Sequence, residues 1–173
     1  MDINAKKKIV LMTTGGTIDK SYDEFDGTLA NRDSLIKTHI LDKLRFPYLE
    51  IEQISILSKD SLHFTEYDRI LLAKSIEAQS SKGHPVVVLH GTDSMAKSAQ
   101  FIKDYLGELA VPIIFTGAMK PVGYSDSDAY QNVVSALMSS QTVSAGIYIS
   151  FHLRLYQIPG VRKNPSIKSF EAF

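Results

Sequence analysis

The stretch that decides the fold is Ile9-Val10-Leu11-Met12-Thr13-Thr14-Gly15-Gly16-Thr17-Ile18, in which an apolar run ends at two glycines followed by a threonine. A continuous apolar run of this kind is typical of a central parallel strand that is covered on both faces. Paired glycines let the backbone turn tightly and come close to a ligand. We therefore expect a buried strand that places the Thr17 hydroxyl at the edge of a sheet. An ordinary strand-to-loop turn would leave the same pattern, so the rest of the chain has to decide.

Segments typical of strands and of helices alternate along the chain. Runs rich in Val, Ile, Leu, Phe or Tyr predict strands at 9–13, 51–57, 86–90, 112–116 and 145–151. Capping residues, helical periodicity and glycine stops predict helices between them, over 33–44, 65–81 (stop at Gly83), from Asp93 or Ser94 to Leu106 (stop at Gly107), and 127–140. This repeat favours a parallel, doubly wound sheet with right-handed crossovers. The tail over 151–173 contains two prolines and a glycine, and we expect it to be less regular.

Length and composition narrow the classes of protein. The 173 residues fit one domain, and 44% hydrophobic residues with 19 basic and 19 acidic side chains are typical of a soluble globular protein. Nucleic acid and anionic membranes are disfavoured as partners because the charges balance. The absence of cysteine excludes disulfides, thiolate zinc sites and a cysteine nucleophile. Neither a secretory signal nor a membrane span is predicted, so we expect a cytoplasmic protein.

Polar clusters follow four of the predicted strands. They are Thr14-Gly15-Gly16-Thr17, Ser58-Lys59-Asp60-Ser61, His90-Gly91-Thr92-Asp93 and Thr116-Gly117-Ala118-Met119-Lys120. Ligands of open α/β sheets bind beyond the carboxyl ends of the strands, where these clusters should meet. Glycine beside a hydroxyl suits backbone N–H groups to bind an anion or a polarised carbonyl, which makes Gly16 and Gly91 candidate substrate-binding residues. Dinucleotide binding is disfavoured, because the first cluster lacks the third glycine of GxGxxG.

Three of these segments carry a resemblance to a known family. TGGTI (14–18), HGTDSM (90–95) and TGAMKP (116–121), with Ser-x-Asp at 58–60 between them, resemble the bacterial-type L-asparaginases over nearly the whole chain. The resemblance implies a three-layer α/β/α sandwich with a flavodoxin-like sheet of about five strands. It also implies a single N-terminal-type domain over residues 1–173. Long-form members have a second domain, so the chain resembles the short form, although a piece of a longer protein would give the same sequence.

The resemblance assigns catalytic roles to two residues near the first turn. Thr17 is the candidate nucleophile, with Thr14 as the next candidate. A threonine hydroxyl needs a neighbour that takes its proton, and the resemblance gives this role to Tyr22. We expect the segment around Tyr22 to close over Thr17 as a lid and to be open without ligand.

A second group consists of Thr92, Asp93 and a lysine. The best match for the lysine is Lys163, which follows the last predicted strand, while Arg162 is the adjacent alternative. Proton relay favours lysine, because arginine keeps its proton in proteins. Lys120 stands where the family usually carries arginine, and we expect it to orient its loop.

A substrate clamp is implied by Ser58 and Asp93. Ser58 would bind the α-carboxylate of an amino acid and Asp93 its α-ammonium group. Lys59 stands where the family commonly has an amide, and it would either strengthen carboxylate binding or face solvent.

The predicted function is hydrolysis of L-asparagine to L-aspartate and ammonia, by a dimer or tetramer that needs no cofactor and no metal. The five histidines have no metal-ligand spacing. Preference for glutamine is an alternative, since one methylene changes binding by only about 1–3 kcal/mol. A non-catalytic amino-acid sensor is another alternative, disfavoured because sensing needs no base. A structural or partner-binding domain is disfavoured by the polar clusters.

Overall fold

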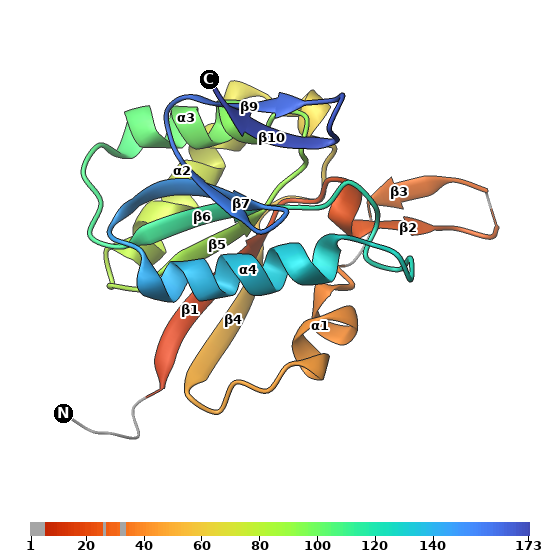
Figure 1. The fold of residues 1–173 in the computed structure, drawn as a ribbon, viewed down its shortest axis with the longest axis horizontal. Coiled ribbons are helices and arrows are strands. Elements are labelled where there is room, and N and C mark those ends of the chain that lie inside the picture. The colour runs from red at the N-terminus through yellow and green to blue at the C-terminus, as the bar shows by residue number, and fades with distance from the viewer. Residues whose placement is uncertain (1–5, 26, 32–33) are drawn as a thin grey trace.

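A six-stranded sheet forms the middle layer of the molecule. The computed structural model describes residues 6–25, 27–31 and 34–173. The strand order is β4-β1-β5-β6-β7-β8 (Figure 1). The strands are β1 (Lys7–Thr13), β4 (Leu49–Ser55), β5 (Val86–Leu89), β6 (Pro112–Thr116), β7 (Gly146–Phe151) and β8 (Arg154–Gln157). The first five in the order are parallel, and β8 runs antiparallel to β7.

The topology confirms the expected doubly wound sheet. The chain goes from β1 to β4 on one side and then returns to β5 on the other side of β1. The order of the parallel strands is therefore that of flavodoxin-like sheets, whose switch point lies at the first strand. Ligands of such sheets bind at this switch point, beyond the carboxyl ends of the strands. All five predicted parallel strands are present, each within two residues of the expected bounds.

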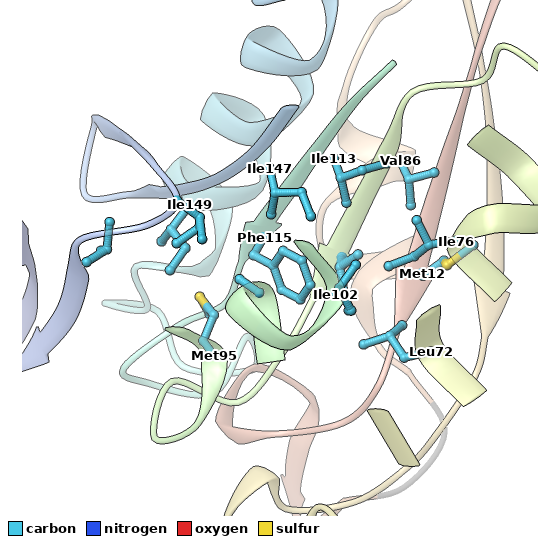
Figure 2. Packing of buried hydrophobic residues seen from close by; sticks show 14 of the residues in the cluster. Met12, Leu72, Ile76, Val86, Met95, Ile102, Ile113, Phe115, Ile147 and Ile149 are labelled. Atoms are coloured by element: carbon cyan, nitrogen blue, oxygen red, sulfur yellow. The ribbon is translucent and has the colours of Figure 1, made fainter. Parts of the chain in front are cut away.

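Helices cover both faces of the sheet, which explains why the central strands are continuous apolar runs. Helices α2 (Glu66–Ser80) and α3 (Met95–Leu106) pack on one face, and Figure 2 shows their Leu72, Ile76 and Ile102 among side chains of the strands. Helix α4 (Ala129–Thr142) covers the other face, together with the single turn α1 (Ile36–His39) and the 3₁₀ turn η2 (Leu41–Lys43). The resulting three layers match the predicted sandwich.

The helix boundaries follow the sequence signals to different degrees. The capping box at Thr65 and Asp68 is present, and Gly107 ends α3 with φ +67°. Ser94 is at the N-cap position of α3, but its hydroxyl donates to the carbonyl of Ser61 and caps nothing. Helix α4 lies two residues later than predicted. None of the described helices has the length and apolar composition needed to cross a bilayer.

The predicted helix over 33–44 is wrong in length. Asp33, its expected start, lies outside the described residues, and the α-helical part is only Ile36–His39. The N-cap residue Leu35 has no capping side chain, and Ile40 leaves the helical region with φ −122°. The β-branched residues Ile36, Thr38 and Ile40 also lower helix propensity. Apolar periodicity alone did not sustain a helix here.

The tail is more regular than predicted. Residues 151–154 form a tight turn between β7 and β8, in which His152 and Leu153 have positive φ (47° and 62°). A second hairpin pairs β9 (Val161–Asn164) with β10 (Ser169–Ala172). The expectation rested on the prolines and glycine, but these residues lie between the strands and leave the pairing intact.

Candidate active site

The two glycines after β1 bring three strand-end loops into contact. Gly15 and Gly16 have φ of +89° and +84°, which side-chain-bearing residues rarely adopt. A Cβ on Gly15 would lie 2.4 Å from the backbone nitrogen of Lys59, and one on Gly16 would lie 2.5 Å from Cα of Gly91. The Gly16 N–H donates to the carbonyl of Lys59 at 3.2 Å. Gly16 thus lets the turn after β1 lie against Gly91, and its N–H is already bonded within the protein.

Thr17 begins the 3₁₀ turn η1 (Thr17–Asp19) immediately after the glycines, and it is half-buried. The two residues after it anchor the turn. Ile18 is fully buried, and the Asp19 carboxylate accepts a hydrogen bond from the Ser34 hydroxyl at 2.9 Å. Burial raises the pKa of the Asp19 carboxyl, although hydrogen bonds from Ser34 and from the backbone of Leu35 act to lower it. The backbone that carries Thr17 is therefore fixed on both sides.

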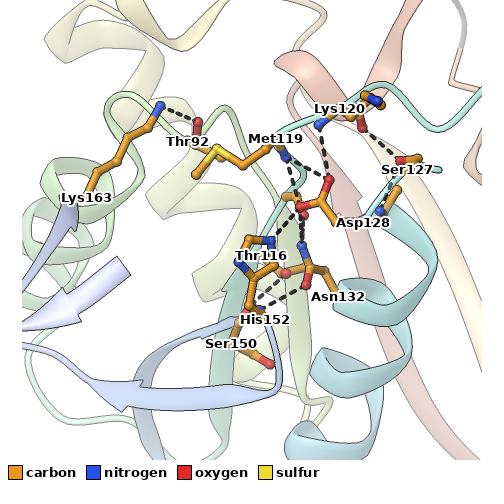
Figure 3. Close-up of polar contacts among 12 residues, drawn as sticks. Thr92, Thr116, Met119, Lys120, Ser127, Asp128, Asn132, Ser150, His152 and Lys163 are labelled. Atoms are coloured by element: carbon orange, nitrogen blue, oxygen red, sulfur yellow. Dashed lines mark hydrogen bonds and ion pairs between the residues drawn. The ribbon is translucent and has the colours of Figure 1, made fainter. Parts of the chain in front are cut away.

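Thr92, Asp93 and Lys163 form a hydrogen-bonded cluster. The Lys163 ammonium donates to Thr92 Oγ1 at 2.9 Å and to Asp93 Oδ1 at 2.8 Å. Figure 3 shows Lys163 reaching Thr92 from strand β9. Arg162 instead donates to Glu171 on β10 at 2.8 Å, because successive side chains of a strand point to opposite faces. Of the two alternatives in the tail, the structure brings Lys163 and not Arg162 to Thr92.

Ser58 and Lys59 follow β4 and lie in different surroundings. Ser58 and Gly15 border a cavity of about 910 Å³ between β4 and the α1–η2 segment. The Lys59 ammonium forms an ion pair with Asp68 at 2.8 Å, at the start of α2. Burial acts to raise the pKa of Asp68, but hydrogen bonds from Lys59 and Thr65 lower it overall. Neither alternative expected for Lys59 describes this arrangement, in which its backbone holds the glycine turn and its side chain holds a helix.

Tyr22 lies at the end of strand β2 (Lys20–Tyr22), which pairs with β3 (Leu29–Asn31) in a hairpin. Its side chain is 62% exposed, and its hydroxyl is 4.0 Å from where a Cβ on Gly27 would lie. Figure 1 shows the hairpin projecting from the body of the molecule. The Tyr22 hydroxyl therefore lies over its own hairpin, and closure over Thr17 stays a prediction.

His90 supports the Thr92 loop from inside. Its ring is fully buried between Phe64 and Phe115, with centroid distances of 4.8 and 5.9 Å. Burial lowers the pKa of His90 to about 4, so the ring is neutral at pH 7. Nδ1 lies 2.8 Å from the carbonyl of Gly91 and donates to it in this neutral form.

A polar network behind the Thr116–Lys120 cluster was not predicted from the sequence. Asp128, Asn132 and His152 connect the start of α4 to the loop after β6 and to the β7–β8 turn (Figure 3). Lys120 in that loop forms an ion pair with Asp126 and lies close to this network. The spacing of Asp128 and Asn132, one turn apart on a predicted helix, was the available signal. The partner His152 is distant in sequence and gave none.

Comparison with known families decides the relationship. Residues 8–173 match the family described as Asparaginase, N-terminal. The chain belongs to the asparaginase family. Among the residues that the structure describes, no group of histidine and acidic side chains is arranged to hold a metal ion.

Individual relatives of the asparaginase domain agree with this assignment. The chain is 27% identical over 146 residues to L-asparaginase of Thermococcus kodakarensis, covering 83% of this chain and 44% of the relative. A solved structure of the thermostable L-asparaginase from that organism has a TM-score of 0.85 at 25% identity, over 95% of this chain and 51% of the other. L-asparaginase 1 of Escherichia coli is 30% identical over 158 residues (88% and 46%). One component of the glutamyl-tRNA(Gln) amidotransferase of Thermoplasma acidophilum is 28% identical over 148 residues (84% and 36%). The chain thus spans about half the length or less of the relatives it matches.

Proposed function

We propose that this chain carries the nucleophile and proton-transfer groups of an amidohydrolase that converts L-asparagine to L-aspartate and ammonia. The observation that supports this most is the Thr92–Asp93–Lys163 cluster, which lies at the edge of the sheet where the glycine turn presents Thr17. A hydroxyl, a basic group and nearby N–H donors are what amide hydrolysis requires.

The reaction has two steps. Thr17 Oγ1 forms a bond to the side-chain carbonyl carbon of asparagine once the hairpin closes, and its hydroxyl proton passes to the Tyr22 oxygen while the phenol gives its own proton to the amide nitrogen. The C–N bond then breaks, and the nitrogen leaves as ammonia. In the second step water attacks the Thr17 ester, the ester bond breaks, and aspartate leaves while Thr17 regains its proton.

The Thr92–Asp93–Lys163 cluster acts on these protons. Because the Lys163 ammonium donates to Thr92 Oγ1, the hydroxyl proton of Thr92 is directed to another acceptor, such as the substrate or the attacking water. Asp93 would bind the α-ammonium group and Ser58 the α-carboxylate. Gly16 and Gly91 contribute backbone that lies close to the substrate. Lys59 enters only through its backbone contacts with the glycine turn, because Asp68 engages its ammonium.

Ammonia release tests the proposal. The chain is incubated in parallel with asparagine and glutamine, and a Thr17→Ala variant is compared with a Thr14→Ala variant. Wild-type turnover of asparagine that Thr17→Ala loses and Thr14→Ala retains supports the assignment. Faster release from glutamine would favour a glutaminase. Tight binding of aspartate without turnover of either amide would favour a sensor.

Assembly and location are further proposals. A dimer or tetramer would cover surface around the site, and light scattering of the purified chain measures its mass directly. We also propose a cytoplasmic protein without nucleic-acid or membrane partners, consistent with its balanced charge.

A further inference from the structure

One loop outside the proposed catalytic residues touches both segments that carry a catalytic threonine. It runs from Gly117 to Val122, after β6. The Val122 N–H donates to the carbonyl of Ile18 at 3.1 Å, directly after Thr17. At its other end Gly117 packs on the backbone before Thr92, where a Cβ on Gly117 would lie 2.3 Å from the carbonyl of His90. The loop, which we call the spacer loop, therefore contacts both the turn of Thr17 and the turn of Thr92, and these two turns also touch each other at Gly16 and Gly91.

Asp128 holds this spacer loop. Its carboxylate accepts from the Met119 N–H at 3.0 Å and from the Lys120 N–H at 3.1 Å. The Asn132 side-chain amide donates to the same carboxylate at 3.0 Å, and His152 Nε2 lies 2.9 Å from it. Figure 3 shows these donors converging on Asp128. A carboxylate offers about four acceptor positions, so its capacity is filled.

The carboxylate binds backbone N–H groups of the loop and none of its own helix. Asp128 is at the N-cap position of α4, where an aspartate ordinarily accepts from the N–H groups of the first turn. No such bond is present, and the Ala129 N–H is instead bonded to the Ser127 hydroxyl at 3.0 Å. Because the Asp128 carboxylate binds the preceding loop instead of the N–H groups of the first turn, its structural role is to fix the position of that loop.

Asn132 and His152 extend this support. The Asn132 amide also donates to the carbonyl of Gly117 at 2.9 Å, and its oxygen accepts from the backbone N–H of His152 at 3.0 Å. His152 has φ +47° in the β7–β8 turn, and its ring packs on Phe151 with a centroid distance of 4.4 Å. The spacer loop is thus tied to α4 and, through His152, to the sheet.

We infer that Asp128, supported by Asn132 and His152, is a positioning residue that holds Thr17 and Thr92 in their relative position through the Gly117–Val122 loop. This inference rests on the proposed amidohydrolase function. Asp128 touches neither threonine, and it acts on the reaction only through the loop. Misplacement of reacting groups by about 1 Å can cost 10²-fold in rate, so loss of this hold should reduce turnover more than binding.

Kinetics of an isosteric variant test the effect on the reaction. Asp128→Asn replaces one acceptor oxygen by an N–H donor that opposes the loop N–H groups, and we expect kcat to fall about 10- to 100-fold with KM within about twofold of wild type. The matched control is Asp126→Asn, the same substitution two residues earlier, at a carboxylate that contacts the Lys120 side chain. It should retain the wild-type kcat.

A pair of His152 variants separates positioning from packing. His152→Gln keeps an N–H donor near the position of Nε2, and we expect kcat within about threefold of wild type. His152→Phe keeps a ring on Phe151 and removes the donor, and its kcat should fall toward that of Asp128→Asn. A packing role would give the opposite order.

Amide hydrogen exchange of wild type and Asp128→Asn tests the inference without turnover. We expect faster exchange at residues 17–19 and 91–93 in the variant, with α4 unchanged beyond its first turn. If the wild type hydrolyses neither amide, the proposed function fails, and the exchange pattern alone decides whether Asp128 positions the two segments. Unchanged kcat in Asp128→Asn, or extra exchange confined to 119–120 and α4, would overturn the inference.

Discussion

The Thr92–Asp93–Lys163 cluster and the β2–β3 hairpin differ in how the fold supports them. Thr92 is 3% exposed and is bonded to a lysine 71 positions later in the chain. On the hairpin, Tyr22 is 62% exposed and Phe25 is 99% exposed. One part of the proposed site is thus assembled by the packed sheet, while the residue proposed as base lies on a projecting element.

Side-chain contacts anchor the hairpin at its base. Lys20 forms an ion pair with Asp60 at 2.8 Å, which lowers the pKa of the Asp60 carboxyl, and Asp19 is bonded to Ser34. Beyond these contacts β2 and β3 pair with each other. Elements with few buried contacts open at low cost in free energy, which suits a segment that closes on substrate. Under the proposed function, the groups for binding and proton relay would therefore be preformed, and the base would reach the site last.

The largest expected effect is at Lys163, in the fixed part of the site. Lys163→Met keeps most of the aliphatic stem and removes the ammonium that binds Thr92 and Asp93. We expect kcat for asparagine to fall about 10²- to 10⁴-fold, as for loss of a general acid–base group. Arg162→Met is the matched control, since Arg162 binds Glu171 and should leave kcat near wild type. Inactivity of Arg162→Met with retained activity of Lys163→Met would reverse the assignment.

Low pH should lower the free energy of unfolding through His90, which supports the Thr92 loop. Its pKa is about 4 in the folded protein, against about 6.5 when unfolded, so the unfolded state binds more protons between these values. The contribution of His90 to the free energy of unfolding is complete above pH 6.5, and about 3 kcal/mol is lost as the pH falls to 4. Urea unfolding at several pH values, compared with His90→Gln, isolates this contribution because the other titrating groups are shared. Parallel curves for the two proteins would contradict it.

Tyr22→Phe tests the hairpin. Phenylalanine keeps the ring and removes the hydroxyl, so a catalytic phenol predicts a fall in kcat of about 10²-fold with a smaller change in KM. A lid that only shields the substrate predicts modest changes in both constants. Kinetics equal to those of wild type would exclude Tyr22 as the base.

The smallest effect is expected at the tip of the hairpin. Phe25→Ser replaces an almost fully exposed ring, and we expect the free energy of unfolding to change by less than about 0.5 kcal/mol. Thermal unfolding measures it. A larger loss would mean that the tip packs on the body in solution, which would remove the contrast between the two regions.

Much of the fold could be predicted because its signals are local. The run at Ile9–Thr13 shows a buried parallel strand by its composition, and Thr65 with Asp68 shows a helix start by hydrogen bonds within four residues. The β9–β10 pairing could not be predicted, since Pro159 and Gly160 just before β9 and Pro165 between the two strands dominate the local composition. Periodicity over 33–44 misled because it reports a buried face and not helix length.

The candidate site also has parts that local sequence signals predict and parts that they do not. The glycine turn was predictable because only glycine suits positive φ with another backbone 2.5 Å from its missing Cβ. The ion pair of Lys59 was not predicted, since its partner Asp68 belongs to a capping box that already explained that aspartate. His152 was missed because its contact with Asp128 joins residues 24 positions apart. Long-range polar contacts need the fold before they can be inferred.

The most direct test of the central claim is mass spectrometry of a covalent intermediate. Lys163→Met is mixed with asparagine, quenched in acid after milliseconds to minutes, and digested with a protease. We expect a β-aspartyl group on the peptide that contains Thr17, and its absence from Thr17→Ala treated in the same way. An adduct on Thr14 or Thr92, or ammonia release by the wild type with no adduct at any time, would contradict the assignment of Thr17 as the nucleophile.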